Sequence, residues 1–128
     1  MPMDPDNVNS GGFSRNNLIH SVDQSLERLQ TNYIDLLQLD GLDGNTSIAE
    51  TIRNLDELVT ARKIAHFGVC NFKGWQLQKV IDITRQLNTH KCVAATGEYN
   101  LLTRGCELEV CEVCRNEGMA FFGYAPLK

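Results

Sequence analysis

The chain has 128 residues, of which 42% are hydrophobic and 22% are charged, and its formal net charge is -4. This composition is typical of a globular protein, excludes the disordered and fibrous classes, and allows one domain at most. The acidic balance with scattered Lys and Arg residues argues against nucleic-acid binding. The sequence has neither an apolar run of the roughly 20 residues that cross a bilayer nor a signal-peptide pattern, so we expect a cytoplasmic protein without nucleic-acid or membrane partners.

The first elements alternate between loop, helix and strand. Residues 1–13 are expected to form a loop or a disordered N-terminus, because they contain two of the three prolines and a pair of glycines. Apolar residues then recur at helical spacing, which predicts a helix that begins with Ser14 as its N-cap and ends near Gln30. The apolar run over residues 33–39 is typical of a mostly buried strand.

The same pattern repeats along the rest of the chain. Helices are predicted over residues 48–59, 75–87 and about 104–117, and strands over residues 64–69, 92–95 and 119–124. Ser47 and Glu50 have the spacing of a capping box before the second helix. The strands begin about 30 residues apart, which is the length of one strand-plus-helix unit. This alternation predicts an α/β fold with a parallel sheet and right-handed crossovers.

Two architectures remain open at this stage, an open doubly wound sheet and part of a closed eight-unit barrel. A complete barrel needs roughly 250 residues, so the length of the chain favours the open sheet. A nucleotide-binding open sheet, however, has a Gly-rich turn after its first strand. The loop from Asp40 to Gly44 has neither the GxGxxG nor the P-loop pattern.

The cysteines and histidines do not form a metal-binding pattern. The chain has five cysteines, and we expect all of them to be reduced thiols. Cys111 and Cys114 have CxxC spacing, but no second CxxC and no paired histidine accompanies them, so we interpret them as part of an amphipathic helix. The histidines at 20, 66 and 90 share no common spacing. We therefore expect no metal site.

Four segments at the strand ends resemble the aldo-keto reductase family in order and spacing. They are residues 25–39, 68–72, 98–102 and 124–127. The resemblance covers the chain from about Ser14 onward and implies that residues 14–128 are a partial (β/α)8 TIM barrel with about four parallel strand-helix units. It also implies NADP(H) as the cofactor, and a small aldehyde or ketone as the substrate that a complete barrel reduces to an alcohol.

The resemblance further implies that the chain is a fragment with the family's barrel strands four to seven. The catalytic Asp, Tyr and Lys of the family would lie before Met1, and its segment for the cofactor 2′-phosphate beyond Lys128. Four strands taken from a barrel have two open edges, at residues 33–39 and 119–124, and an uncovered apolar inner face. We therefore expect self-association through these edges, and two copies supply the eight strands of a barrel.

The resemblance assigns roles to five positions of this sequence. Asn71 lies where the family's Asn binds the nicotinamide carboxamide, and Tyr124 lies where an aromatic ring stacks on the nicotinamide. Asp40 lies at the position of the catalytic His, but an ionised carboxylate donates no proton and repels a developing oxyanion. Cys70 replaces a Ser beside Asn71, and Thr96 replaces a longer Gln that reaches the carboxamide.

Three of these positions also have a purely structural interpretation. Asp40 is then a solvated carboxylate at a strand end, Asn71 a cap of the following helix, and Tyr124 an ordinary aromatic residue at the barrel rim. The sequence therefore leads to two hypotheses. The chain is either an aldo-keto reductase-like oxidoreductase fragment that is inactive alone, or a non-catalytic truncated or regulatory relative with residual dinucleotide binding.

Overall fold

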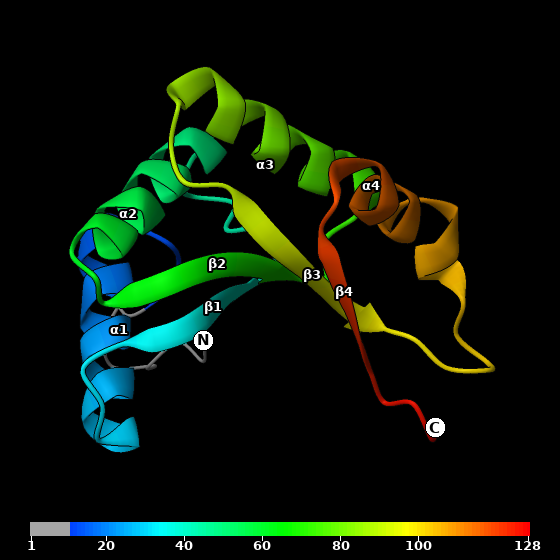
Figure 1. Cartoon of the computed structure of the whole chain (residues 1–128), viewed down its shortest axis with the longest axis horizontal. Coiled ribbons are helices and arrows are strands. Elements are labelled where there is room, and N and C mark those ends of the chain that lie inside the picture. The colour runs from blue at the N-terminus through cyan, green and yellow to red at the C-terminus, as the bar shows by residue number, and fades with distance from the viewer. Residues whose placement is uncertain (1–10) are drawn as a thin grey trace.

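Helices and strands alternate along the chain in the computed structural model, which describes residues 11–128 (Figure 1). The elements are α1 (Arg15–Leu29), β1 (Ile34–Asp40), α2 (Ile48–Thr60), β2 (Ile64–Cys70), α3 (Gly74–Leu87), β3 (Cys92–Glu98), the 3-10 helix η1 (Gly105–Leu108), α4 (Val110–Glu117) and β4 (Ala120–Tyr124). All predicted elements are confirmed within a few residues except the fourth helix. The first ten residues of the expected N-terminal loop lie outside the described residues.

The four strands form one sheet in the order β1-β2-β3-β4, and each neighbouring pair is parallel. A doubly wound sheet reverses its strand order at a switch point and carries helices on both faces. Here consecutive strands are always neighbours, and α2, α3 and α4 arch over one side of the sheet (Figure 1). This arrangement is that of a barrel segment, which decides between the two architectures that the sequence left open.

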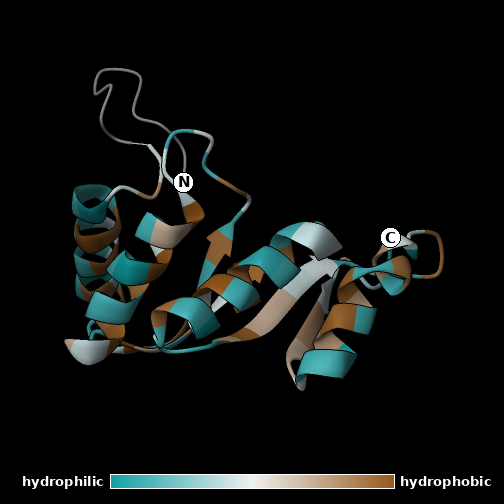
Figure 2. Cartoon of the chain, turned by 90° about the horizontal axis from the view of Figure 1, so that it is seen from above, coloured by the Kyte–Doolittle hydropathy of each residue, from teal (hydrophilic) through white to brown (hydrophobic). Residues whose placement is uncertain are grey.

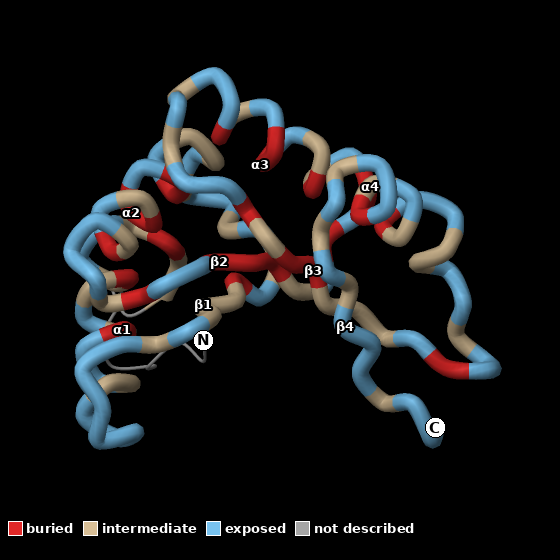
Figure 3. The backbone as a smooth tube through the Cα atoms, viewed as in Figure 1, coloured by how far each residue is buried: buried red, intermediate tan, exposed pale blue. Residues whose placement is uncertain are grey.

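The hydrophobic core lies between this sheet and its helices. Side chains of paired residues in a parallel sheet point to the same face. The row Leu39, Val69, Ala95 and Phe121 faces the helices and belongs to the core or packs against it. In Figure 3 the buried segments lie along β2 and on the helix turns that face it, and Figure 2 shows mostly hydrophilic residues on the outer sides of the helices.

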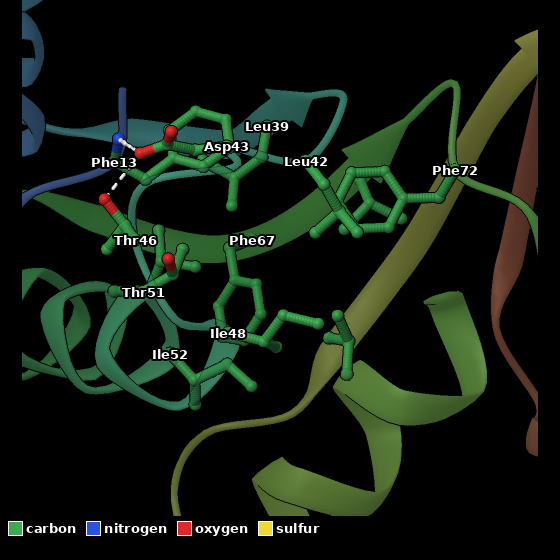
Figure 4. Close-up of a pocket in the computed structure, with 13 residues that line it drawn as sticks. Phe13, Leu39, Leu42, Asp43, Thr46, Ile48, Thr51, Ile52, Phe67 and Phe72 are labelled. Atoms are coloured by element: carbon green, nitrogen blue, oxygen red, sulfur yellow. Dashed lines mark hydrogen bonds between the residues drawn. The ribbon is translucent and has the colours of Figure 1, made fainter. Parts of the chain in front are cut away.

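The segment before α1 is fixed to the loop after β1 through Asp43. Its carboxylate accepts hydrogen bonds from the backbone N–H groups of Phe13 and Asn45, each at 2.9 Å, and from the hydroxyl of Thr46. The Phe13 side chain is buried among the core residues of Figure 4. The cavity there has a volume of only about 10 Å³ for a water-sized sphere, too little for a ligand.

The N-caps of α1 and α2 lie at the positions that the sequence predicts. The hydroxyl of Ser47 accepts a hydrogen bond from the N–H of Glu50 at 3.2 Å, as expected for the start of α2. Ser14 occupies the N-cap position of α1, but its side chain makes no capping hydrogen bond. The predicted N-cap position is therefore confirmed, and α1 is stabilised by its buried residues Leu18 and Val22 rather than by a side-chain cap.

The predicted helix over residues 104–117 is broken in two at Glu109. The backbone of this residue leaves the helical region, with φ -134° and ψ -64°. Its carboxylate accepts a hydrogen bond from the N–H of Gly74 at the start of α3, at 3.0 Å. A Cβ at Gly74 would lie 2.4 Å from the Cβ of Glu109, so this approach requires glycine. The tertiary contact with α3 therefore overrides the helical periodicity.

The cysteines are all unpaired in the structure, as predicted. Cys114 is buried in the core, and Cys111 lies half-buried on α4, which agrees with an amphipathic helix. Among residues 11–128 no group of His, Cys, Asp and Glu side chains is arranged to hold a metal ion. Within the same range, every helix is too short or too polar to cross a membrane.

Candidate functional site

The predicted site residues meet where the carboxyl ends of the strands lie side by side. The register aligns Asp40 of β1, Cys70 of β2, Thr96 of β3 and Phe122 of β4 in one row. This row points to the face of the sheet opposite the core row, which is the inner face of a barrel. Chemistry in such barrels takes place at this end of the strands, so the row and the loops after it form the candidate site.

Hydrogen bonds join Asp40, Asn71 and Tyr124 within this site. The Nδ2 of Asn71 donates to the Oδ1 of Asp40 at 2.8 Å, and the hydroxyl of Tyr124 donates to the Oδ1 of Asn71 at 2.9 Å. The three residues come from the ends of β1, β2 and β4, and are 31 and 53 positions apart in the sequence. The fold thus brings together four of the five predicted site residues through their side chains, because the thiol of Cys70 also interacts with Asp40.

Asn71 is placed by its backbone as well as by its side chain. It adopts a left-handed conformation with φ 60°, which Asn tolerates better than most residues. Its N–H donates to the carbonyl of Thr96 at 2.9 Å. The N-cap of α3 is Lys73, so the interpretation of Asn71 as a helix cap was wrong. Its amide instead connects strand ends.

Cys70 and Thr96 are the two remaining predicted site residues, and they flank Asn71 in the structure. Burial, then the charge of Asp40 and a hydrogen bond to it, raise the pKa of the Cys70 thiol. The thiol is therefore protonated at neutral pH. The Oγ1 of Thr96 is buried and has no hydrogen-bond partner within residues 11–128. The hydrogen bond between Thr96 and Asn71 is therefore made by the main-chain carbonyl of Thr96 and not by its side chain.

Asn100 is a further residue of this region that the sequence analysis did not single out. Its Oδ1 accepts hydrogen bonds from the N–H groups of Leu102 and Thr103, at 2.9 and 2.8 Å, and its Nδ2 donates to the carbonyl of Ala125 at 3.2 Å. Asn100 is buried, and it fixes the loop after β3 against the chain after β4. The sequence carried a signal for this role, because Asn100 follows a predicted strand and Asn side chains often organise turns.

The charges near the site are mainly negative. Glu98 accepts a hydrogen bond from the ammonium of Lys128 at 3.0 Å, and this contact lowers the pKa of the Glu98 carboxyl. A groove of about 410 Å³ begins at Asn71 and runs between the loops after β2 and β3, with Lys73 as its one basic lining residue against Glu98 and Glu109. A dinucleotide carries phosphates, which clustered basic side chains and free N–H groups bind. The groove has a single lysine in its lining and therefore no cluster of basic side chains for these phosphates.

The arrangement therefore does not fit NADP(H) in the manner that the resemblance implies. Asn71 directs one end of its amide to Asp40 and the other to Tyr124. Thr96 offers no side-chain group in place of the family's Gln. The resemblance also puts a carboxylate, that of Asp40, at the position of the family's proton donor to a carbonyl oxygen. We accordingly derive no catalytic step through the cofactor.

Comparisons with known proteins agree on the family of this chain. The model of the Aldo/keto reductase family matches residues 3–128. The chain is 34% identical over 120 residues to norsolorinic acid reductase B from Dothistroma septosporum, which covers 94% of this chain and 31% of that protein. It is 32% identical over 122 residues to versiconal hemiacetal acetate reductase from Aspergillus parasiticus, which covers 95% of this chain and 35% of that protein.

A solved structure agrees with the sequence relatives. The crystal structure of the thermostable aldo-keto reductase Tm1743 in complex with the inhibitor epalrestat superposes with a TM-score of 0.83 and 28% sequence identity. The match covers 90% of this chain and 41% of that chain. The fold is therefore a partial TIM barrel of the aldo-keto reductase type. The chain spans about a third of the length of the curated relatives that it matches.

Proposed function

Because the chain belongs to the aldo/keto reductase family, we propose that its family reaction is the NADPH-dependent reduction of aldehydes or ketones to alcohols. We further propose that the 128 residues by themselves do not catalyse this reaction and bind NADPH weakly. The relatives named above are reductases, which supports the reaction class. A small carbonyl compound is the proposed substrate of a complete barrel that contains these strands.

Asp40 is the observation that carries the proposed inactivity. Hydride transfer to a carbonyl carbon places negative charge on the oxygen, and a donor at the strand end stabilises this charge. We propose that Asp40 takes that place, as the family resemblance implies. It lies at the carboxyl end of β1, accepts a hydrogen bond from Asn71, and has no proton to donate when ionised. An ionised carboxylate raises the energy of the oxyanion instead of lowering it.

The proposal is tested with the purified 128-residue chain. NADPH absorbance is followed with a panel of aldehydes and ketones, and NADPH binding is followed by cofactor fluorescence. We expect no turnover above the rate without protein, and no saturation at micromolar NADPH. Turnover at a rate comparable to that of a complete reductase contradicts the proposal.

A non-catalytic role is the second candidate function. The Asn71 amide makes its hydrogen bonds within the chain, and the neighbouring groove has no cluster of basic side chains, which favours a protein that has lost catalysis over one that has changed substrate. In this case weak dinucleotide binding remains without turnover. The two hypotheses differ in the binding experiment. A truncated or regulatory relative retains saturable dinucleotide binding, whereas the inactive fragment binds NADPH too weakly to saturate at micromolar concentrations.

We also propose that a second copy of the chain covers the open sheet edges. Within residues 11–128 the strands β1 and β4 each have a neighbour on one side only, and Phe122 on the inner face is 49% exposed. Two copies provide the eight strands at which a barrel of this kind closes, so that no edge remains. The unpaired cysteines suit a reducing compartment, and we propose the cytoplasm as the location.

A further inference from the structure

We propose that Asp40 is a positioning residue that locks the amide of Asn71 and closes the site to a carboxamide ligand. Asp40, Asn71 and Tyr124 are here called the strand-end clasp. The inference rests on the proposed function only for the identity of the excluded ligand, the nicotinamide group of NADPH. The locking itself follows from contacts within the chain.

The partners of Asn71 decide which way its amide points. A carboxylate only accepts hydrogen bonds, so Asp40 requires the Nδ2 of Asn71 on its side. The Oδ1 is then directed to Tyr124, whose hydroxyl donates to it. Because a hydrogen bond to an ionised group is stronger than one between neutral groups, Asp40 makes the dominant contact.

The main chain that carries Asn71 and Asp40 is anchored at both strand ends. Its φ of 60° and the hydrogen bond of its N–H to Thr96 fix the Cα at the end of β2. Asp40 is also held, because the next N–H, that of Gly41, donates to the carbonyl of Cys70 at 2.9 Å. Donor and acceptor are therefore both carried by anchored main chain.

A carboxamide ligand competes with the clasp at both ends. To pair with the amide of Asn71, the ligand must supply an acceptor to Nδ2 and a donor to Oδ1. Asp40 already accepts from Nδ2, and the Tyr124 hydroxyl already donates to Oδ1. The ligand oxygen would also meet the carboxylate of Asp40 at close range. Removing the carboxylate eliminates the stronger competitor and the repulsion together.

The clasp is tested first by NMR in the absence of any cofactor. In the 15N-labelled chain, the side-chain amide signals of Asn71 are assigned by their loss in Asn71→Ala. We expect one Asn71 amide proton to exchange with water at least tenfold more slowly than exposed Asn amides. Asp40→Ala removes this protection, while Asp40→Asn, which keeps an acceptor oxygen, restores part of it. Unchanged exchange in Asp40→Ala overturns the proposal.

A matched control separates the clasp from a general loss of acidic charge. Asp35 lies on the same strand, is exposed, and makes no side-chain hydrogen bond within residues 11–128. Asp35→Ala is expected to leave the exchange of Asn71 as in the unaltered chain. Should Asp40→Ala fail to fold, as judged by circular dichroism, Tyr124→Phe loosens the other end of the amide. We expect Asn71 exchange in that variant to increase by a few-fold, and no increase contradicts the clasp.

NADPH fluorescence titration tests the closing of the site. Loss of a competing charged hydrogen bond predicts an affinity about tenfold higher in Asp40→Ala than in Asp35→Ala. Equal affinities, or no binding by either variant, overturn the closing role, while the exchange experiment decides the locking role separately. Carbonyl reduction by the unaltered chain contradicts the proposed inactivity and does not alter the exchange result, so the two failures are distinguishable.

Discussion

The side-chain amide of Asn71 donates a 2.8 Å hydrogen bond to the carboxylate of Asp40, from the end of β2 to the end of β1. Both residues lie where the chemistry of a barrel of this type takes place. The contact gives Asp40 a role that is independent of catalysis, because it organises the strand ends. It also explains how an acidic residue is accommodated at this position.

Tyr124→Phe is expected to reduce the free energy of unfolding by about 1 kcal/mol, which is the typical net value of one hydrogen bond. The hydroxyl of Tyr124 donates to Asn71 and thereby ties the edge strand β4 to β2. Urea denaturation followed by circular dichroism measures the change. Tyr33→Phe is the control, since the Tyr33 hydroxyl has no hydrogen-bond partner within residues 11–128, and equal effects of the two substitutions contradict the prediction.

Asp43→Asn is expected to destabilise the chain by about 2 kcal/mol at neutral pH, because hydrogen bonds to a charged group exceed those to a neutral one. Hydrogen bonds from Thr46 first, and then from Asn45 and Phe13, lower the pKa of Asp43 below its usual 3.8. The contribution of this carboxylate to stability is therefore complete above about pH 4 and is lost as the pH falls through the lowered pKa.

The effect of Asp43→Asn on the free energy of unfolding is therefore expected to depend on pH. Urea unfolding at a series of pH values should show the difference between Asp43→Asn and the unaltered chain becoming smaller below about pH 4. Asp35→Asn, on an exposed residue of β1, is expected to change stability by less than about 0.5 kcal/mol. A difference for Asp43→Asn that stays constant down to the acid limit would refute the role of its charge.

Leu77→Ala is expected to cost about 3 kcal/mol, because the side chain is completely buried on α3 and its removal leaves a cavity. Leu101→Ala is the matched control, since Leu101 is 88% exposed and its truncation leaves the core intact. The midpoints of urea unfolding compare the two. Similar midpoints would mean that the helices do not pack on the sheet as described.

Gly74→Ala is expected to destabilise the chain by more than about 1 kcal/mol through overpacking. The added Cβ would lie 2.4 Å from the Cβ of Glu109, which must move away and lose its hydrogen bond to the start of α3. Gly44→Ala tests the same change where no atom lies within 4 Å. Thermal unfolding measures both variants, and a stabilised Gly74→Ala would rule out the close approach.

Phe122→Glu is expected to shift the chain from dimer to monomer in light scattering coupled to size exclusion. The side chain is 49% exposed on the inner face of β4, where a second copy must pack, and burying an unpaired carboxylate there is costly. Trp75→Glu places the same charge at a 58% exposed aromatic residue of α3 and should leave the mass unchanged. A monomer in the unaltered chain over a wide concentration range excludes the proposed self-association.

The periodicity of the apolar residues alone determined which segments are helices and which are strands. Leu18 and Val22 of α1 or Leu55 and Leu58 of α2 are buried because they recur at helical spacing, and this local signal needs no knowledge of distant contacts. The resemblance of the strand-end segments identified the family in the same way, since the order and spacing of motifs are properties of the sequence itself.

The tertiary structure decided what those residues contact. Glu109 breaks a helix that its own sequence favours, because the start of α3 approaches it. The strand order excluded a doubly wound sheet, which strand-helix alternation could not do. The clasp joins positions 40, 71 and 124, and a hydrogen bond between residues so far apart depends on the register of the strands, which no local pattern specifies.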